Sequence, residues 1–338
     1  MLRLGVLDQS IAGTGRPQSV AIRDTVALAQ HCEALGYDRF WVSEHHNHPT
    51  IVGTAPEILM AAIAAVTQRI RIGSAGVMLP HYAPFKVAEQ FRVLDALAPG
   101  RIDMGLGRAP GSDRLTAFAL NSMADERPEQ FPGDVRDLLA WVSHSPLPDQ
   151  HPYRALVAQP TGDTVPQMWM LGSSDYGAQV AAHFGLPYSF AWFFTDGRGG
   201  RHALDLYREL YRPSASFPQA HSSICVWAMV ADTAEEAQYH FTSRARWRVF
   251  RDRGTFLPFG PPDDPSSPPL TGADEARIEQ LRRDELVGTA DDVAARIKTL
   301  ATDLGVQEVA VVTWAHDEVA RRRSYELLAE AFELTCAA

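Results

Sequence analysis

Short apolar runs alternate with longer amphipathic stretches along most of the chain. After the first run, Leu4–Leu7, apolar residues recur every three or four positions as far as Gly36. That spacing predicts a helix that ends at this glycine. Helices are also expected at 56–66 and 84–97, the first behind a capping-box pattern at Thr54–Glu57. The first third of the chain is therefore a series of strand-then-helix units.

The apolar runs predict eight strands: Leu4–Leu7, Phe40–Val42, Ile70–Met78, Ile102–Leu106, Met168–Leu171, Tyr188–Trp192, Ile224–Val230 and Val309–Thr313. Helices separate most of them, so the sheet should be parallel. Eight such units suggest closure into a (β/α)8 TIM barrel, an α/β fold, with residues 1–338 as one domain. A doubly wound open sheet usually has fewer strands per domain, and a two-domain version would need a linker that the sequence lacks.

Two stretches are longer than ordinary loops. Residues 110–166 follow the fourth strand and contain one expected helix, Asp134–Val142. Residues 254–274 are rich in proline and follow the seventh strand. Both are predicted insertions, and the second should leave the barrel on the face where such enzymes act. We expect 254–274 to be a mobile loop or lid, with a plain disordered insertion as the alternative.

Composition narrows the class of protein. The chain has 338 residues, 46% of them apolar, so a sizeable core is possible. Its net charge is −10 and no basic run appears, which argues against a nucleic-acid partner. The three cysteines (Cys32, Cys225 and Cys336) are far apart and odd in number, which fits a reducing compartment. We see no signal peptide and no apolar segment long enough to span a bilayer, so we expect a cytoplasmic protein without a membrane partner.

The segment Glu44-His45-His46 directly follows the apolar run Phe40–Val42. Titratable side chains at the carboxyl end of a strand are where α/β barrels do chemistry. A polar strand end that simply meets solvent is the other interpretation. Metal binding is a third, since His46-Asn47-His48 is an H-x-H pair. The fifth and sixth strands end in Gly-Ser-Ser and Trp-Phe-Phe, which leaves such a site short of ligands.

Three further segments could bind a ligand. Gly105–Gly111 is a poor dinucleotide fingerprint, because its third glycine falls one place late and Pro110 stands where a helix should begin. Arg108 suits a phosphate, or a surface ion pair. The stretch 171–178 after the fifth strand opens a helix, so its serines fit either an anion site or ordinary N-capping. The small residues Gly73–Val77 fit either a flat ligand lying on the backbone or close strand packing.

Four segments taken together resemble the bacterial luciferase-like flavin monooxygenases. They are Glu44–His46, Gly73–Pro80, Gly100–Arg108 and Ala181–Pro187. The likeness spans nearly the whole chain and extends to Val287–Val293. It implies a (β/α)8 barrel that binds reduced FMN, takes O2 as co-substrate and receives the flavin from a separate NAD(P)H-flavin reductase.

The resemblance also implies roles for single residues. Arg108 would hold the flavin phosphate with the serines and the amide that follow the fifth strand, and Ala75-Gly76 would form a non-prolyl cis peptide beneath the flavin ring. Glu44 would help to position the ring, and His45 would be a general acid/base that titrates near neutrality. The implied cofactor-binding residues are Ala75, Gly76, Arg108, Leu171, Ser173, Ser174 and Gly177.

We therefore expect a flavin-dependent monooxygenase that oxygenates a small organic substrate. The alternatives are hydride transfer through a deazaflavin on the same fold, and a flavin-binding protein without catalysis. The expected substrate pocket comprises Asp8, Gln9 and Ser10 after the first strand, and Trp192, Phe193 and Phe194 after the sixth. The resemblance suggests a homodimer formed through helices near the second and third strands.

Overall fold

The parallel barrel is confirmed by the computed structural model, which describes residues 2–109, 112–123 and 129–335. In this part of the chain eight strands close a ring in the order β10-β1-β2-β3-β5-β6-β7-β8, with β8 returning to β10 and every pairing parallel. The barrel strands are β1 (Arg3–Asp8), β2 (Arg39–Val42), β3 (Arg71–Ser74), β5 (Ile102–Gly107), β6 (Gln167–Gly172), β7 (Tyr188–Phe190), β8 (Ser222–Val230) and β10 (Glu308–Val312).

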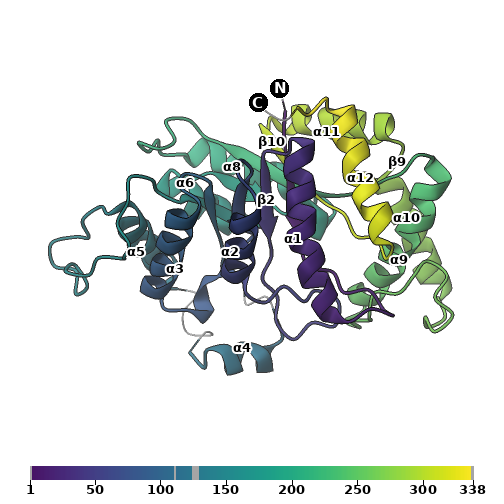
Figure 1. Cartoon of the computed structure of the whole chain (residues 1–338), viewed down its shortest axis with the longest axis horizontal. Coiled ribbons are helices and arrows are strands. Elements are labelled where there is room, and N and C mark those ends of the chain that lie inside the picture. The colour runs from purple at the N-terminus through teal and green to yellow at the C-terminus, as the bar shows by residue number, and fades with distance from the viewer. Residues whose placement is uncertain (1, 110–111, 124–128, 336–338) are drawn as a thin grey trace.

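Helices surround the strands, and Figure 1 shows α1, α2 and α3 along one wall with α9 and α10 on the opposite flank. Apolar side chains of the outer helices pack against the strands because each helix presents one apolar face. The helices are α1 (Gln18–Leu35), α2 (Pro56–Val66), α3 (Pro84–Leu97), α4 (Arg114–Leu120), α5 (Phe131–Ser143), α6 (Asp175–Phe184), α7 (Trp192–Thr195), α8 (Gly200–Leu210), α9 (Ala234–Asp252), α10 (Gly272–Asp284), α11 (Ala290–Leu304) and α12 (Glu318–Ala331). No helix in the described ranges is long and apolar enough to cross a membrane.

The third predicted strand is two elements. The chain pairs as β3, passes through a cis peptide between Ala75 and Gly76, and pairs again as β4 (Val77–Met78), before the 3-10 turn Leu79–His81. At this interruption Gly76 lies against β5, since a Cβ there would meet the Gly105 carbonyl oxygen at 2.8 Å. Close packing with β5 therefore decides the composition of this segment.

Two other local predictions are corrected, and one strand was not predicted. The capping box before α2 is absent: Ala55 is the N-cap and no side chain caps the helix. The sixth strand is shorter than expected because Trp192 begins α7, where its ring fills the space left by Gly197 and Gly200. The apolar pattern did not predict β9 (Leu286–Gly288), a three-residue strand that pairs with the end of β8 outside the ring.

The segment 254–274 packs over the carboxyl-terminal mouth of the barrel. It follows α9, and its last residues belong to α10. The Thr50 hydroxyl donates to the Leu257 carbonyl (2.9 Å) and the Thr14 amide to the Phe259 carbonyl (2.9 Å). Phe259 itself is fully buried. The segment thus has its own anchors, and its mobility stays a prediction.

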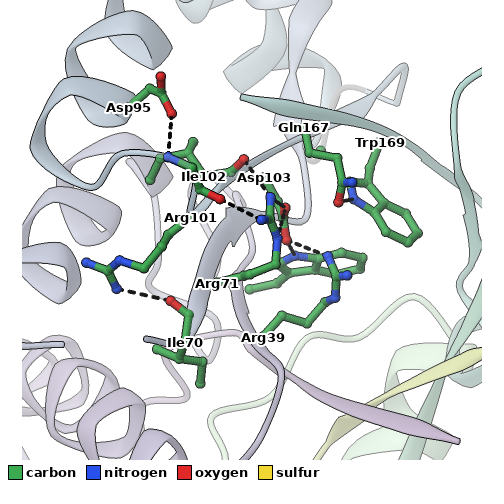
Figure 2. Close-up of polar contacts among 12 residues, drawn as sticks. Arg39, Ile70, Arg71, Asp95, Arg101, Ile102, Asp103, Gln167 and Trp169 are labelled. Carbon is green, nitrogen blue, oxygen red and sulfur yellow. Dashed lines mark hydrogen bonds and ion pairs between the residues drawn. The ribbon is translucent and has the colours of Figure 1, made fainter. Parts of the chain in front are cut away.

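A buried ion cluster closes the opposite, amino-terminal end of the barrel (Figure 2). Asp103 of β5 accepts from Arg39 Nη1 (2.6 Å), Trp41 Nε1 (2.9 Å) and Arg71 Nη2 (2.6 Å). Arg39 also pairs with Glu308 of β10 (2.8 Å). Because these carboxylates lie at the strand starts, they stabilise the barrel and take no part in a site at its mouth. Cys32 and Cys225 are free and buried, and Cys336 lies outside the described residues.

Candidate active site

A cavity of about 530 Å³ opens at the carboxyl ends of the barrel strands. It is lined by the segments after β1 and β2, by the cis peptide, by the ends of β6 and β7, and by one face of α9. Its walls are mainly apolar, with a few polar groups that point inward. An enclosed apolar space with few polar groups is the form that small-molecule sites take.

Glu44 lies behind this cavity and does not line it. Its side chain is fully buried and accepts hydrogen bonds from His46 Nε2 (2.8 Å), the Tyr82 hydroxyl (2.6 Å) and the Met78 amide (3.0 Å). Three donors on one carboxylate fix the loop after β2 to the segment β4. Glu44 therefore shapes the floor on which a ligand would rest, through other residues.

His45 lines the cavity, and its Nδ1 is buried without a hydrogen-bond partner among the described residues. Burial, together with the nearby His48 and His46, lowers the pKa of His45 from its usual 6.5 to about 4. The expectation that it titrates near neutrality is therefore wrong for this environment. His45 is a neutral imidazole at pH 7, with one ring nitrogen free to exchange a proton or a hydrogen bond with a ligand.

His48 stands beside His45 in the same wall, with ring centroids 6.4 Å apart. Its Nδ1 accepts from the amides of Thr50 (3.0 Å) and Ile51 (2.9 Å). Burial, and secondarily Arg251, lowers the pKa of His48 to about 4. A neutral ring whose Nδ1 accepts must carry its proton on Nε2. The backbone thus fixes His48 as a hydrogen-bond donor.

The small residues of β3 are explained mostly by packing. A Cβ on Gly73 would meet the Trp41 ring at 2.5 Å, and a Cβ on Gly105 would collide with the backbone of Ser74. Only Ala75 of this segment lines the cavity, next to the cis peptide that the resemblance implied. The alternative of close strand packing therefore accounts for Gly73, while Ala75 offers a flat surface to a ligand.

The predicted phosphate residues come together beside the cavity. Arg108 is exposed, and its guanidinium stacks on the Tyr176 ring of α6 at 4.0 Å. Ser174 is the N-cap of α6, yet its side chain makes no capping bond. The structure records no hydrogen bond of the Ser173 or Ser174 hydroxyls to any described residue. N-capping by these serines is thus not realised, and their hydroxyls have no partner among the described residues.

The remaining predicted residues divide between the cavity and its surroundings. Leu171, Gln9, Phe193 and Phe194 line the cavity. Gly177, Gly76 and Trp192 lie outside its lining, as do Asp8 and Ser10. Asp8 is instead a buried structural carboxylate that accepts from Arg321, from the Thr25 hydroxyl (2.8 Å) and from the Ser10 amide (2.6 Å). The expectation that Asp8, Ser10 and Trp192 contact substrate is therefore wrong. Pro110 and Gly111 lie outside the described residues.

Sequence reasoning missed one wall completely. Arg244, Trp247 and Arg251 of α9 line the cavity, together with Phe256 and Trp314. The spacing of Arg244, Arg248 and Arg251 on one helix face was visible in the sequence, but a row of arginines usually marks a solvated face. Only the position of α9 across the mouth turns that face inward.

No group of three or more His, Cys, Asp or Glu side chains in the described ranges is arranged to hold a metal ion. The Nδ1 of His48 accepts hydrogen bonds from backbone amides, and the Nε2 of His46 is hydrogen-bonded to Glu44. These two ring nitrogens are thus committed to hydrogen bonds within the protein.

Comparison with known proteins agrees with this geometry. The family model described as luciferase-like monooxygenase matches residues 2–308. N-acetyl-S-alkylcysteine monooxygenase of Bacillus subtilis is 36% identical over 335 residues, covering 98% of each chain. The crystal structure of apo-MsnO8 superimposes with a TM-score of 0.88 at 34% identity, over 99% of both chains. The oxygenating constituent of 3,6-diketocamphane monooxygenase from Pseudomonas putida, solved in complex with FMN, shares the fold with a TM-score of 0.70 at 19% identity, over 98% of this chain and 97% of that one.

Proposed function

The chain belongs to the luciferase-like monooxygenase family, and we propose that it uses reduced FMN and O2 to oxygenate a small organic substrate. The proposal rests on two features that lie next to each other at the barrel mouth. An apolar cavity of about 530 Å³ adjoins a set of free hydrogen-bond donors formed by Arg108 and the start of α6. A flat apolar ring system that ends in a phosphate needs this combination.

The residues present fit FMN. Arg108 has no carboxylate partner among the described residues, and Ser173 and Ser174 have uncommitted hydroxyls next to the first amides of α6. Helix N-termini and arginine both favour phosphate. Gly177 lies so close to the Tyr188 ring that a Cβ there would be tight, at 3.4 Å. We assign the phosphate to Arg108, Ser173, Ser174 and the Gly177 region, and the ring to the surface of Ala75 and Leu171.

When bound, reduced FMN would supply the electrons that activate O2, and the protein would provide position and shielding. The aromatic side chains of Trp247, Phe193 and Phe256 exclude water from the cavity. His45, neutral at pH 7, accepts or returns a proton at a ring nitrogen that no protein group occupies. His48 donates from Nε2, and Glu44 keeps the loop that carries both imidazoles in place.

We further propose that a separate reductase supplies the flavin and that the chain acts as a homodimer. Large apolar side chains are exposed along α2 and α3, with Ile58 68%, Val93 48% and Leu97 60% exposed. Neighbouring exposed apolar residues mark interaction surfaces. Light scattering of wild type and Leu97→Glu tests the dimer: a monomeric wild type, or an unchanged mass in the variant, contradicts this surface.

The test of function is an anaerobic titration with reduced FMN, oxidised FMN and a deazaflavin, in wild type and Arg108→Ala. Arg154→Ala, which removes an exposed arginine outside the cavity, is the matched control. We expect reduced FMN to bind best, with affinity lost only in Arg108→Ala. Preference for the deazaflavin would indicate hydride transfer instead. Formation of oxygenated product from an N-acetyl-S-alkylcysteine, the substrate type of the Bacillus subtilis relative, with reduced FMN and O2 then tests turnover, because free reduced FMN consumes O2 by itself; flavin binding without turnover on any substrate would favour a non-catalytic flavoprotein.

A further inference from the structure

One guanidinium in the cavity wall has no charge partner in the described part of the chain. The Arg244 side chain of α9 lines the cavity although the residue is only 3% exposed. Its Nε and Nη1 are buried without a hydrogen-bond partner among the described residues, and no carboxylate of those residues lies within ion-pair distance. A buried charge without a partner is costly, so it is rare unless a ligand supplies the partner.

The neighbours on the same helix show that this is particular to Arg244. Arg248, one turn further along, pairs with Asp196 (2.8 Å) and Asp252 (3.0 Å). Arg246 donates to the Ser267 hydroxyl (3.0 Å) and the Pro268 carbonyl (3.1 Å) outside the cavity. Glu285 is the first opposite charge to act on Arg244, but the two make no direct contact. Other arginines of α9 thus have ion-pair or hydrogen-bond partners within the protein, and Arg244 has none among the described residues.

Aromatic rings surround the free guanidinium. Its central carbon lies 5.0 Å from the ring centroid of Trp314, 5.4 Å from Trp227 and 5.6 Å from Trp247. The indole nitrogens of Trp227 and Trp247 are also buried donors without a partner in the described part of the chain. Unpaired donors therefore cluster at this end of the cavity, among aromatic rings.

The other titratable groups of the cavity wall leave its α9 side positively charged. Arg251, over the Phe194 ring at 4.7 Å, is a second arginine of the same wall, and its contact with Asp252 is loose at 3.8 Å. The imidazoles of His45 and His48 are neutral at pH 7. Among the described residues, the one carboxylate in the lining is Asp113, which accepts from Thr116 and Asn47 on the α4 side. The wall formed by α9 therefore attracts an anion.

We propose that Arg244 binds the carboxylate of the substrate, and that the substrate class is small organic acids whose apolar portion lies among Trp247, Phe193 and Phe256. This rests on the proposed function for the identity of the site, and goes beyond it in naming the substrate class and the residue that selects it. The planar fork of arginine binds two carboxylate oxygens at once, and aromatic walls strengthen that pairing by excluding water. The family assignment itself leaves both the substrate class and this residue open.

The test is calorimetric titration without flavin or oxygen. The probes are 3-phenylpropionate and its primary amide, which match in shape and differ in charge. Wild type should bind the carboxylate about tenfold or more tightly than the amide, the factor expected for charge-assisted hydrogen bonds. Arg244→Met should lose this preference, and Arg246→Met, which removes the same charge from the same helix outside the cavity, should keep it.

Three results would overturn the proposal. The first is no difference in affinity between the two probes in wild type, and the second is a difference that survives in Arg244→Met. The third is a loss of FMN affinity in Arg244→Met with carboxylate binding intact, which would show that the guanidinium binds the flavin. Because the probe titration needs no flavin, a protein that prefers the carboxylate but binds no FMN would refute the proposed function and leave this subsite standing.

Discussion

The neutral state of His45 has a consequence for stability that can be measured without any ligand. Burial lowers its pKa from 6.5 to about 4. Between these two pH values, His45 is therefore protonated in the unfolded chain and neutral in the folded protein. The contribution of His45 to the free energy of unfolding is therefore fully present above about pH 6.5, and it is lost as the pH falls from 6.5 towards 4. At 1.36 kcal/mol for each pH unit the limit is about 3 kcal/mol, of which about 2 kcal/mol is lost between pH 7 and pH 4.5.

The experiment compares urea unfolding of wild type and His45→Gln at pH 7 and pH 4.5. Glutamine keeps the polarity and does not titrate, so the fall in unfolding free energy should be about 2 kcal/mol smaller in the variant. His202→Gln removes an imidazole with a 70% exposed side chain and should fall like wild type. Equal falls in wild type and His45→Gln would refute the reasoning, because His45 would then titrate alike in both states.

Three other substitutions test the argument at separate places, each by urea unfolding at pH 7. Asp103→Asn breaks the buried cluster at the base of the barrel and should cost about 3–5 kcal/mol, whereas a loss below about 1 kcal/mol would mean that the arginines find other partners. Glu44→Gln replaces an acceptor of three hydrogen bonds and should cost about 1–3 kcal/mol; an unchanged midpoint would show that the carboxylate does not hold the loop. Arg244→Met removes an unpaired buried charge and should stabilise the protein by about 1–4 kcal/mol, and destabilisation would reveal a partner for the guanidinium within the protein.

The local pattern of the sequence determined the barrel. Its strand-then-helix units depend on the spacing of apolar residues, which is a property of neighbours along the chain. It also placed His45, Arg108, Ser173 and Ser174 just after strands, and a parallel barrel brings the carboxyl ends of all its strands to one mouth. Any titratable or phosphate-binding residue just after a strand is then a candidate, wherever it lies in the chain.

Tertiary structure alone decided what each side chain meets. Asp8 stands at the carboxyl end of a strand, close to the place that His45 has after its own strand. The Asp8 carboxylate nevertheless forms an ion pair with Arg321 inside the protein. Arg244 and Arg248 lie one turn apart on α9, and Asp196, far away in the chain, pairs with Arg248 and not with Arg244. Periodicity reports which face of a helix is apolar, whereas the partner of a charge depends on contacts between distant segments. The sequence could therefore name candidate residues at the mouth, and only the fold could show which charges find partners within the protein.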